Sequence, residues 1–354
     1  MCRRHRPDPG DTPTPTPAIE PSAVREAARR IAGRLHRTPL VHCGTLDRLA
    51  GCTLLLKAEN LQRTGSFKAR GNLNRLLRLS DAERRRGVVA ASAGNHAQGL
   101  AWAARDLGAP CTIVMPTTAP LAKLDATRAY GATVERVGTI YDDCEARAAA
   151  IAAASGMTLV HPCTDPDVVA GHGTVGLEIL EEQPGVDIIV VPVGGGGLIS
   201  GIALAAQAVR AAHPTGDPPP RRVRIVGVQP EGSAPMLRSL EAGHLVALDH
   251  VATIADGLAG REVYALTLDL VARWTEGIVL VSEQEMLDAM LLLMTRAKLV
   301  AEPSGAAGLA ALLAGRVPVE PSSTVACVLS GGNQDPDLLA RWIAGGVEGA
   351  AIAH

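Results

Sequence analysis

The sequence has little net charge and no cysteine pairing pattern. Its 354 residues carry 34 Lys and Arg against 36 Asp and Glu, a formal charge of −2 at pH 7. A nucleic-acid-binding domain typically shows a basic excess, so we expect no nucleic-acid partner. The seven cysteines are odd in number and include no CxxC pair. This pattern favours free thiols in a reducing cytosol over a disulfide framework or a metal site.

The sequence also lacks a convincing membrane segment. Residues 1–18 are rich in Pro, Thr and Asp and have no apolar signal-peptide core, which predicts a disordered tail and a cytoplasmic protein. Residues 188–206 carry no charge, but Pro192 and four consecutive glycines argue against a spanning helix. We therefore expect no membrane partner, and the chain length predicts two compact domains.

Strand-like and helix-like segments alternate along the chain, which predicts an α/β fold with parallel sheets covered by helices. The predicted strands are 54–57, 88–91, 111–115, 133–137, 188–193, 223–228, 278–281 and 324–329. Ser80 and Ser282 are each followed three residues later by Glu, which predicts capping boxes at two helix N-termini. Met286, Met290 and Met294 would share one face of the second of these helices, a pattern more typical of core than of function.

Four consecutive glycines lie between an apolar strand-like run and a helix-like segment. At such a junction Gly194, Gly195, Gly196 and Gly197 would present free backbone N–H groups and the positive end of a helix dipole to a phosphate. Neither GxGxxG with a following acidic residue nor GxxxxGK[ST] fits, so a phosphate monoester is favoured over a dinucleotide. The alternative is a flexible connection.

Lys68 gives the glycine run a chemical purpose. It follows Phe67, the only phenylalanine of the chain, in Thr64-Gly-Ser-Phe-Lys-Ala-Arg-Gly-Asn72. Apolar surroundings disfavour an ammonium, lower its pKa and free the amine to form an imine. A lysine beside a phosphate cradle is what a protein needs to hold pyridoxal phosphate. The alternative is an ordinary surface lysine after a Gly-Ser turn.

Two further polar turns follow predicted strands. Residues 92–98, Ser-Ala-Gly-Asn-His-Ala-Gln, lead into a predicted helix at about 99–107, and this turn can bind a carboxylate. Helix capping is the alternative for Asn95 and His96. Ser330-Gly-Gly-Asn333 follows the strand 324–329. Polar residues past the carboxyl ends of parallel strands are where open α/β sheets bind ligands.

In this order the motifs resemble those of the fold-type II pyridoxal-phosphate enzymes, and among them the threonine/serine dehydratases (threonine ammonia-lyases), which are related to serine racemases. The resemblance extends from about Ala27 to Asp335. The motifs that carry it are Arg37-Thr-Pro-Leu40, Gly65-Ser-Phe-Lys-Ala-Arg-Gly-Asn72, Ala91-Ser-Ala-Gly-Asn-His-Ala-Gln98, Gly171-His-Gly-Thr-Val-Gly-Leu-Glu178, Val193-Gly-Gly-Gly-Gly-Leu-Ile-Ser200, Ala255-Asp-Gly-Leu258, Ala301-Glu-Pro-Ser-Gly305 and Ser330-Gly-Gly-Asn333.

The resemblance implies two open, twisted parallel-sheet domains with pyridoxal 5′-phosphate in the cleft between them. A small domain, 61–157, would be inserted into a discontinuous large domain, 19–60 and 158–354. It also implies a homo-oligomer, a dimer or a tetramer, and a small-molecule amino-acid substrate.

Residue roles follow from the same resemblance. Lys68 would form the imine and later take the α-proton of the substrate, beside Phe67. The four glycines would bind the cofactor phosphate, and Ser330 would face the pyridine nitrogen, with Glu302 nearby. Asn95 would hydrogen-bond the phenolic oxygen of the ring. The substrate carboxylate would be held by the loop of Ser92, Ala93, Gly94, Asn95 and His96.

The implied reaction is β-elimination. A neutral serine at the ring nitrogen cannot support a pyridinium as a carboxylate would, which favours quick loss of a β-substituent. We expect L-threonine to give 2-oxobutanoate and ammonia, with L-serine to pyruvate as a side activity. A serine racemase, a hydroxyaspartate ammonia-lyase and a non-catalytic cofactor-binding protein are the alternatives.

Several positions depart from related patterns. Racemases of this kind carry a serine where Ala93 stands, and acidic metal ligands where Gln229 and Pro235 stand. The resemblance therefore favours elimination and implies no metal. Cys163 replaces an aromatic residue of many dehydratases, and His172 occupies a place more often held by glutamine, so the pocket and the substrate remain open.

Overall fold

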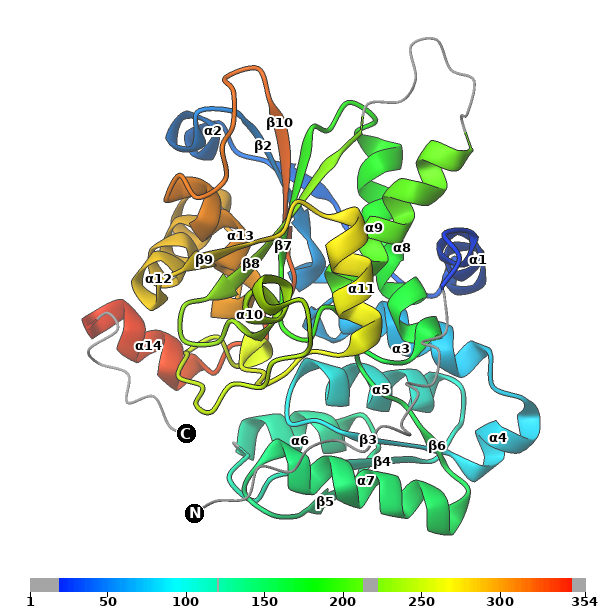
Figure 1. Ribbon diagram of the computed structural model, residues 1–354. Coiled ribbons are helices and arrows are strands. Elements are labelled where there is room, and N and C mark those ends of the chain that lie inside the picture. The colour runs from blue at the N-terminus through cyan, green and yellow to red at the C-terminus, as the bar shows by residue number, and fades with distance from the viewer. Residues whose placement is uncertain (1–18, 120, 213–221, 346–354) are drawn as a thin grey trace, which may run out of the picture.

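Two β-sheets form the framework of the computed structural model, which describes residues 19–119, 121–212 and 222–345 (Figure 1). The larger sheet has the strand order β1-β2-β10-β7-β8-β9. Its strands are β1 (Leu40–His42), β2 (Thr53–Ala58), β7 (Ile188–Pro192), β8 (Arg224–Pro230), β9 (Ile278–Val281) and β10 (Thr324–Leu329). The predicted disordered tail, 1–18, lies outside the described residues.

The smaller sheet lies below the larger one in Figure 1 and has the order β5-β4-β3-β6. Its strands are β3 (Val88–Ala91), β4 (Cys111–Met115), β5 (Thr133–Arg136) and β6 (Thr158–Leu159). All of its pairings are parallel. The two-sheet α/β architecture confirms the predicted fold class. The exact domain limits stay a prediction.

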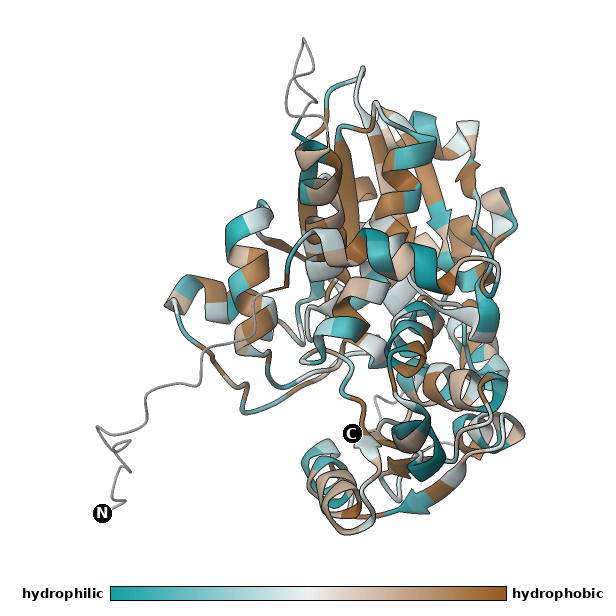
Figure 2. Cartoon of the chain, turned by 90° about the vertical axis from the view of Figure 1, so that its right-hand side faces the viewer, coloured by the Kyte–Doolittle hydropathy of each residue, from teal (hydrophilic) through white to brown (hydrophobic). Residues whose placement is uncertain are grey.

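The inner strands are apolar because both faces of each sheet are covered. Every residue of β3 and of β7 is buried. In the view of Figure 2 the strands of the larger sheet are brown, while teal residues lie on the outer faces of the helices. The apolar runs that predicted β3 and β7 therefore lie inside the two sheets, whereas the predicted strands β5 and β9 are at sheet edges.

Helices cover both faces of the larger sheet. The helices packed on one face are α2 (Gly44–Ala50), α12 (Glu283–Leu292), α13 (Pro303–Leu313) and α14 (Pro336–Gly345). The helices on the other face are α1 (Ser22–Ile31), α8 (Pro166–Glu182), α9 (Gly197–Ala211), α10 (Pro235–Ala242) and α11 (Ala265–Trp274). Met286 and Met290 are buried, as the sequence pattern predicts for a core face.

The smaller sheet is covered in the same way. The helices on one face are α3 (Lys68–Leu77), α5 (Asn95–Asp106) and α6 (Leu121–Ala129), and α7 (Tyr141–Ser155) covers the other. The remaining short elements are α4 (Asp81–Arg86), the 3-10 turns η1 (Glu59–Leu61), η2 (Arg63–Gly65) and η3 (Asp256–Leu258), and the π-turn η4 (Leu293–Ala297). Both predicted capping boxes are present, at Ser80 and Ser282.

The structure corrects three details. The edge strand β1 runs antiparallel to β2, so the larger sheet is not wholly parallel. The two short strands β1 and β6 have no counterpart in the prediction, because three residues or fewer carry too little pattern. The helix predicted to begin near Gly99 begins at Asn95. Its first turn consists of polar and small residues, so the apolar pattern used for the prediction starts later than the helix does.

Candidate active site

The segment before Lys68 is fixed to the end of the central strand β10. The Phe67 N–H donates to the Ser330 carbonyl at 3.0 Å, and the Gly332 N–H donates to the Gly65 carbonyl at 3.0 Å. Gly65 has a φ of 69°, which an L-residue rarely adopts, and a Cβ there would lie 2.3 Å from the Asn333 side chain. These contacts place Lys68, the first residue of α3, beside the carboxyl end of β10.

The Lys68 amine lies in a partly apolar environment. Its Nζ is 4.9 Å from the centre of the Phe67 ring. Burial lowers the pKa of Lys68, and the nearby Cys163 and Glu302 only partly oppose that shift. This is the condition under which a lysine becomes a nucleophile near neutral pH. Phe67 forms the wall that its position in the sequence predicts.

The glycine loop joins β7 to α9 with no room for side chains. A Cβ would lie 3.1 Å from the Gly257 carbonyl at Gly194, and 2.6 Å from the Cys163 sulfur at Gly195. At Gly196, which has a φ of 91°, a Cβ would lie 2.7 Å from Met236, and at Gly197 it would lie 2.9 Å from the Pro162 carbonyl. The Thr267 hydroxyl donates to the Gly195 carbonyl at 2.8 Å. These contacts hold the loop in place, and the first N–H groups of α9 have no partners within the helix.

Asn95 links the two sheets. Its Nδ2 donates to Glu302 Oε1 at 2.6 Å, and its Oδ1 accepts from Asn333 Nδ2 at 2.7 Å. Glu302 and Asn333 belong to the larger domain, whereas Asn95 opens α5 beside the smaller sheet. The structure therefore brings together residues from three of the predicted motifs.

Ser92 organises the turn before α5. Its hydroxyl accepts the N–H groups of Gly94 at 3.2 Å and Ala97 at 3.3 Å. The His96 ring is buried, with its Nε2 3.0 Å from the Val160 carbonyl and its Nδ1 3.4 Å from Asn72 Nδ2. Burial lowers the pKa of His96 to about 3, so the ring is neutral. Because the His96 ring points into the interior, His96 can bind a ligand at this helix N-terminus only through its backbone N–H.

Glu302 is a nearly inaccessible carboxyl group. Burial raises its pKa to about 7, against the hydrogen bond from Asn95 and the charge of Lys123. Lys123, on α6, forms an ion pair with Asp256 in η3. Burial lowers the pKa of Lys123, and Glu302 and Asp335 oppose that shift. A lysine from the smaller domain thus lies among carboxylates of the larger one.

Ser330 is buried at the end of β10. Its hydroxyl lies 3.4 Å from the Ser304 carbonyl, and its own carbonyl accepts the Phe67 N–H. Ser330 is close to both Lys68 and Glu302. Its carbonyl binds the residue before Lys68, and the next residue, Gly331, lies so near Glu302 that a Cβ there would be 2.5 Å from Oε1. The Ser330 hydroxyl has no strong protein acceptor and can serve a ligand.

The two unusual residues both border the site. His172, on α8, is fully buried, and neither ring nitrogen has a hydrogen-bond partner within the described residues. Its ring packs edge-on against Phe67 at 4.7 Å. Burial lowers the pKa of His172 far below its usual range. Burial raises the pKa of Cys163, while Lys68 and the Gly197 N–H oppose that shift.

Sequence reasoning missed several residues near the site. Lys123, Glu145, His161 and Tyr264 gave no signal, because each stands alone in its segment and only the fold brings it to the site. Asn333 was within a recognised motif, but its contact with Asn95 depends on the packing of two domains. Gln229 and Pro235 lie apart from these contacts: Gln229 accepts the Leu237 N–H at 3.1 Å, and Pro235 opens α10.

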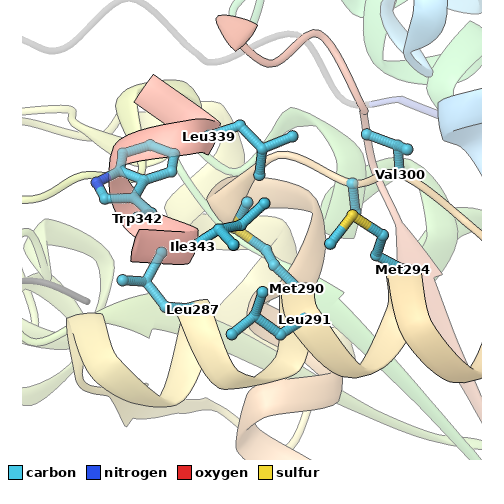
Figure 3. Close-up of a pocket in the computed structure, with 9 residues that line it drawn as sticks. Leu287, Met290, Leu291, Met294, Val300, Leu339, Trp342 and Ile343 are labelled. Carbon is cyan, nitrogen blue, oxygen red and sulfur yellow. The ribbon is translucent and has the colours of Figure 1, made fainter. Parts of the chain in front are cut away.

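A separate hollow lies between α12 and α14, away from this cluster (Figure 3). Its side chains are apolar, and in Figure 3 Met294 and Val300 lie at one end while Leu287 and Trp342 lie at the other. It contains no group able to bind phosphate or transfer a proton. It does not compete as a catalytic site.

The cluster fits pyridoxal phosphate. The glycine loop packs too closely against its neighbours to accept side chains, and it stands at the N-terminus of a long helix, where a phosphate is favoured. Lys68 has a lowered pKa and no hydrogen-bond acceptor within the described residues. The buried and partnerless His172 and the poorly engaged Ser330 hydroxyl are further signs of a place kept for a ligand.

A lysine that can form an imine and a glycine loop at a helix N-terminus, placed where two α/β sheet domains meet, define a pyridoxal-phosphate enzyme. A sequence model described as "Pyridoxal-phosphate dependent enzyme" matches residues 31–331. The chain therefore belongs to the pyridoxal-phosphate dependent enzyme family, and its cofactor is pyridoxal 5′-phosphate.

Individual relatives are similar over most of their length. An L-threonine ammonia-lyase of Thermotoga maritima is 45% identical over 320 residues, which cover 90% of this chain and 77% of that protein. An L-threo-3-hydroxyaspartate ammonia-lyase of a Pseudomonas species is 42% identical, with 91% of this chain and 98% of that protein covered. The structure of maize serine racemase has a TM-score of 0.85 at 35% identity, with 94% and 98% covered. No helix of the described residues is long and apolar enough to cross a membrane.

Proposed function

We propose that this enzyme removes water from a β-hydroxy L-amino acid, converting L-threonine to 2-oxobutanoate and ammonia, with L-serine to pyruvate as a side activity. The observation that carries the proposal is the position of Lys68. Its amine has a lowered pKa and interacts with Cys163, which packs against the glycine loop, and with Glu302, which accepts a hydrogen bond from Asn95 at the start of α5. Sequence similarity to threonine ammonia-lyases supports the same substrate class.

The bound cofactor supplies an electron sink that stabilises negative charge on the substrate α-carbon. Lys68 Nζ takes the α-proton, which requires a neutral amine, and burial favours that form by lowering the pKa of Lys68. The N–H groups at the start of α9 would hold the phosphate, and Asn95, aligned by Glu302 and Asn333, would donate to the phenolic oxygen. Ser330 would be the neutral partner of the ring nitrogen.

The α5 N-terminus binds the substrate carboxylate. The free N–H groups of its first turn and the helix dipole favour an anion there, and the Ser92 hydroxyl shapes the turn. The neutral, buried His96 ring adds no charge of its own. With the carboxylate fixed at this end and the phosphate at the other, the α-carbon lies near Lys68.

The reaction balances without an external oxidant or reductant. The α C–H bond breaks and its proton goes to Lys68, and the β C–O bond breaks as the hydroxyl leaves with a proton as water. The resulting enamine takes up one water and yields the 2-oxo acid and ammonia. Net, one L-threonine gives one 2-oxobutanoate and one ammonium ion.

Racemisation is the second candidate, because the maize serine racemase shares the fold. A racemase needs an acid on the face of the α-carbon opposite the lysine. Ala93 has no proton to give, so we favour elimination. An Ala93→Ser variant is expected to gain α-proton exchange and D-serine formation, and the absence of any gain would count against this argument.

The test of the proposal is to incubate the purified enzyme with L-threonine, L-serine and L-threo-3-hydroxyaspartate, and to measure 2-oxo acid and ammonia together. Stoichiometric release of both from L-threonine is the expected result. No release from any of the three, with the cofactor bound, would favour a non-catalytic cofactor-binding protein. We further propose a cytoplasmic protein, because the cysteines of the described residues are free, as in a reducing compartment. From the resemblance to fold-type II enzymes we also propose a homo-oligomer, a dimer or a tetramer.

A further inference from the structure

Two side chains meet the glycine loop on the same face. Cys163 lies in the loop after β6, and its sulfur is 2.6 Å from the position of a Cβ on Gly195. Tyr264, at the start of α11, is 3.4 Å from the same position. Lys68 opposes the rise that burial causes in the pKa of Cys163, so the thiol also lies near the reactive amine. Cys163 and Tyr264 therefore form a wall beside the place where the substrate reacts.

A histidine and a carboxylate stand behind this wall. His161 Nδ1 accepts the N–H groups of Cys163 at 3.1 Å and of Thr164 at 3.0 Å. The proton of a neutral imidazole must therefore be on Nε2, which donates to Glu145 Oε1 at 3.0 Å. The His161 ring also packs edge-on against Tyr264 at 4.7 Å. The hydrogen bond from His161 lowers the pKa of Glu145, so this carboxylate stays charged.

The charges around the wall are mainly negative. Burial raises the pKa of Tyr264, with Tyr141, Cys163, Glu145 and Glu262 adding to the shift, so its hydroxyl stays neutral. Besides Lys68 itself, the cation near this rim within the described residues is Arg261, which pairs with Asp142 at 3.9 Å and donates to the Leu248 carbonyl at 3.1 Å. The charge of Arg261 is thus largely offset by Asp142, whereas a neutral His161 does not offset the charge of Glu145.

The position of the substrate side chain follows from the two ends that are already assigned. The carboxylate lies at the α5 N-terminus and the α-carbon lies near Lys68. The side chain is then left to face Cys163 and Tyr264. A second carboxylate on that side chain would approach Glu145 and meet like charge.

We propose that the wall formed by Cys163, Tyr264 and the Glu145–His161 pair selects amino acids with an uncharged side chain and rejects a side-chain carboxylate. The proposal rests on the proposed function and narrows its substrate class to threonine and serine, against 3-hydroxyaspartate. Like charges separated by several ångströms across a partly buried site change an affinity by on the order of tenfold. Glu145 acts here through its charge, as a specificity-determining residue.

The experiment compares L-asparagine with L-aspartate on the cofactor-loaded enzyme. The two have nearly the same shape, differ by one charge and carry no β-hydroxyl to eliminate. Their dissociation constants are measured from the change in cofactor absorbance on titration. We expect L-asparagine to bind on the order of tenfold more tightly than L-aspartate, with the ratio shrinking at high salt.

The variants are Glu145→Gln and, as a matched control, Glu181→Gln. A glutamine at 145 can still accept the His161 proton, so only the charge is lost. Glu181 is an exposed α8 carboxylate paired with Arg37. Glu145→Gln should improve L-aspartate binding several-fold and leave L-asparagine unchanged, while Glu181→Gln should change neither. A structural role of Glu145 would weaken both ligands equally.

Three results would overturn the proposal: equal binding of the two ligands by the unaltered enzyme, an unchanged ratio in Glu145→Gln, or no spectral response to either amino acid. Failure of the proposed function looks different. In that case the asparagine preference and its dependence on Glu145 would be present, but no 2-oxo acid would form from L-threonine or L-serine.

Discussion

Lys68 and Arg70 lie two residues apart at the start of α3, but their surroundings differ in one decisive respect. Both are basic side chains removed from most of the solvent. Arg70 has its polar groups engaged by protein atoms, whereas the Lys68 amine has only the Phe67 ring as a close contact within the described residues. One turn of α3 therefore carries a basic group whose hydrogen bonds are all made within the protein, Arg70, and one whose hydrogen bonds are left for a ligand, Lys68.

Arg70 is the centre of a closed network. Its guanidinium donates twice to Glu59, at 2.7 Å each, and to both carboxylate oxygens of Glu178, at 2.6 and 2.9 Å. Lys57 Nζ donates to Glu178 and to the Thr38 carbonyl, each at 2.6 Å. Two cations meet two carboxylates, so the charges balance. The network joins α3, α8 and β2 and leaves nothing for a ligand.

Around Lys68, polar atoms lack partners. Buried side-chain atoms with no hydrogen bond occur at Thr64, Ser66, Asn72, His172 and Ser304. Native proteins rarely leave buried polar groups unpaired, because each such group costs about 1–3 kcal/mol. In the Arg70 region the polar groups bond to each other and stabilise the fold. In the Lys68 region the unpaired polar groups indicate where a ligand binds.

The largest expected effect is the loss of chemistry in Lys68→Ala. Without the amine there is neither an imine nor a base, so the rate should fall on the order of a thousandfold or more, and the imine absorbance should vanish. Absorbance and 2-oxo acid release check the two parts separately. Lys298→Asn is the control, since this exposed lysine has a φ of 60° that asparagine tolerates. Turnover retained in Lys68→Ala would reject the lysine as the base.

Breaking the filled network should damage the fold instead. Arg70→Met leaves Glu59 with an uncompensated charge in the interior and leaves Glu178 with Lys57 as its remaining cation. This is expected to lower the free energy of unfolding by about 3–5 kcal/mol. Urea unfolding measures this. Imine absorbance per folded molecule should be unchanged in the cold. Arg37→Ala, which removes an exposed partner of Glu181, should cost less than about 1 kcal/mol. Equal losses in the two variants would contradict the comparison.

Glu302 should make stability depend on pH. Its folded pKa, about 7, is above the unfolded value of 4.5, so its contribution is fully present below pH 4.5 and is lost as pH rises through 7. Glu302→Gln keeps an acceptor for Asn95 and removes the ionisation. At pH 8 it should raise the free energy of unfolding by up to about 3 kcal/mol, with no difference at pH 4. Denaturation of the cofactor-free protein at several pH values tests this, and a difference that grows toward low pH would reverse the sign.

The smallest effect concerns two buried histidines. His172→Leu removes an imidazole that has no hydrogen bond, so the free energy of unfolding should change by less than about 1 kcal/mol. His96→Leu leaves the Val160 carbonyl without its donor and should cost about 1–3 kcal/mol. Thermal unfolding of the cofactor-free proteins ranks the two. If His172 serves the bound cofactor, cofactor affinity will fall in His172→Leu although stability does not.

Much of the fold was predictable because its strands are short, apolar and bounded by turn residues. All eight predicted strands are present, with ends differing by a residue or two. The strands β1 and β6 were not predictable, since two or three residues have no measurable period. The α5 start was placed too late because the glycines and polar residues before it hide the helical pattern.

The site was predictable as a set of motifs but not as a geometry. The sequence places Lys68, the glycines and Ser330 at loop and strand ends that a parallel sheet brings together. It does not show that Asn95 bonds to Glu302 across the two domains, or that the His96 ring points inward. These facts depend on long-range packing, and so does the pairing of Glu145 with His161.

The strand order has a consequence for synthesis. In the larger sheet, β10 lies between β2 and β7 and pairs with both. The first two strands can therefore join the rest only after residue 329 has left the ribosome. The four strands of the smaller sheet fall within residues 88–159 and meet much earlier. Since long-range pairing is slow and local pairing is fast, the lobe bearing Asn95 can fold on the nascent chain while β2, and with it the approach to Lys68, still waits for its neighbour.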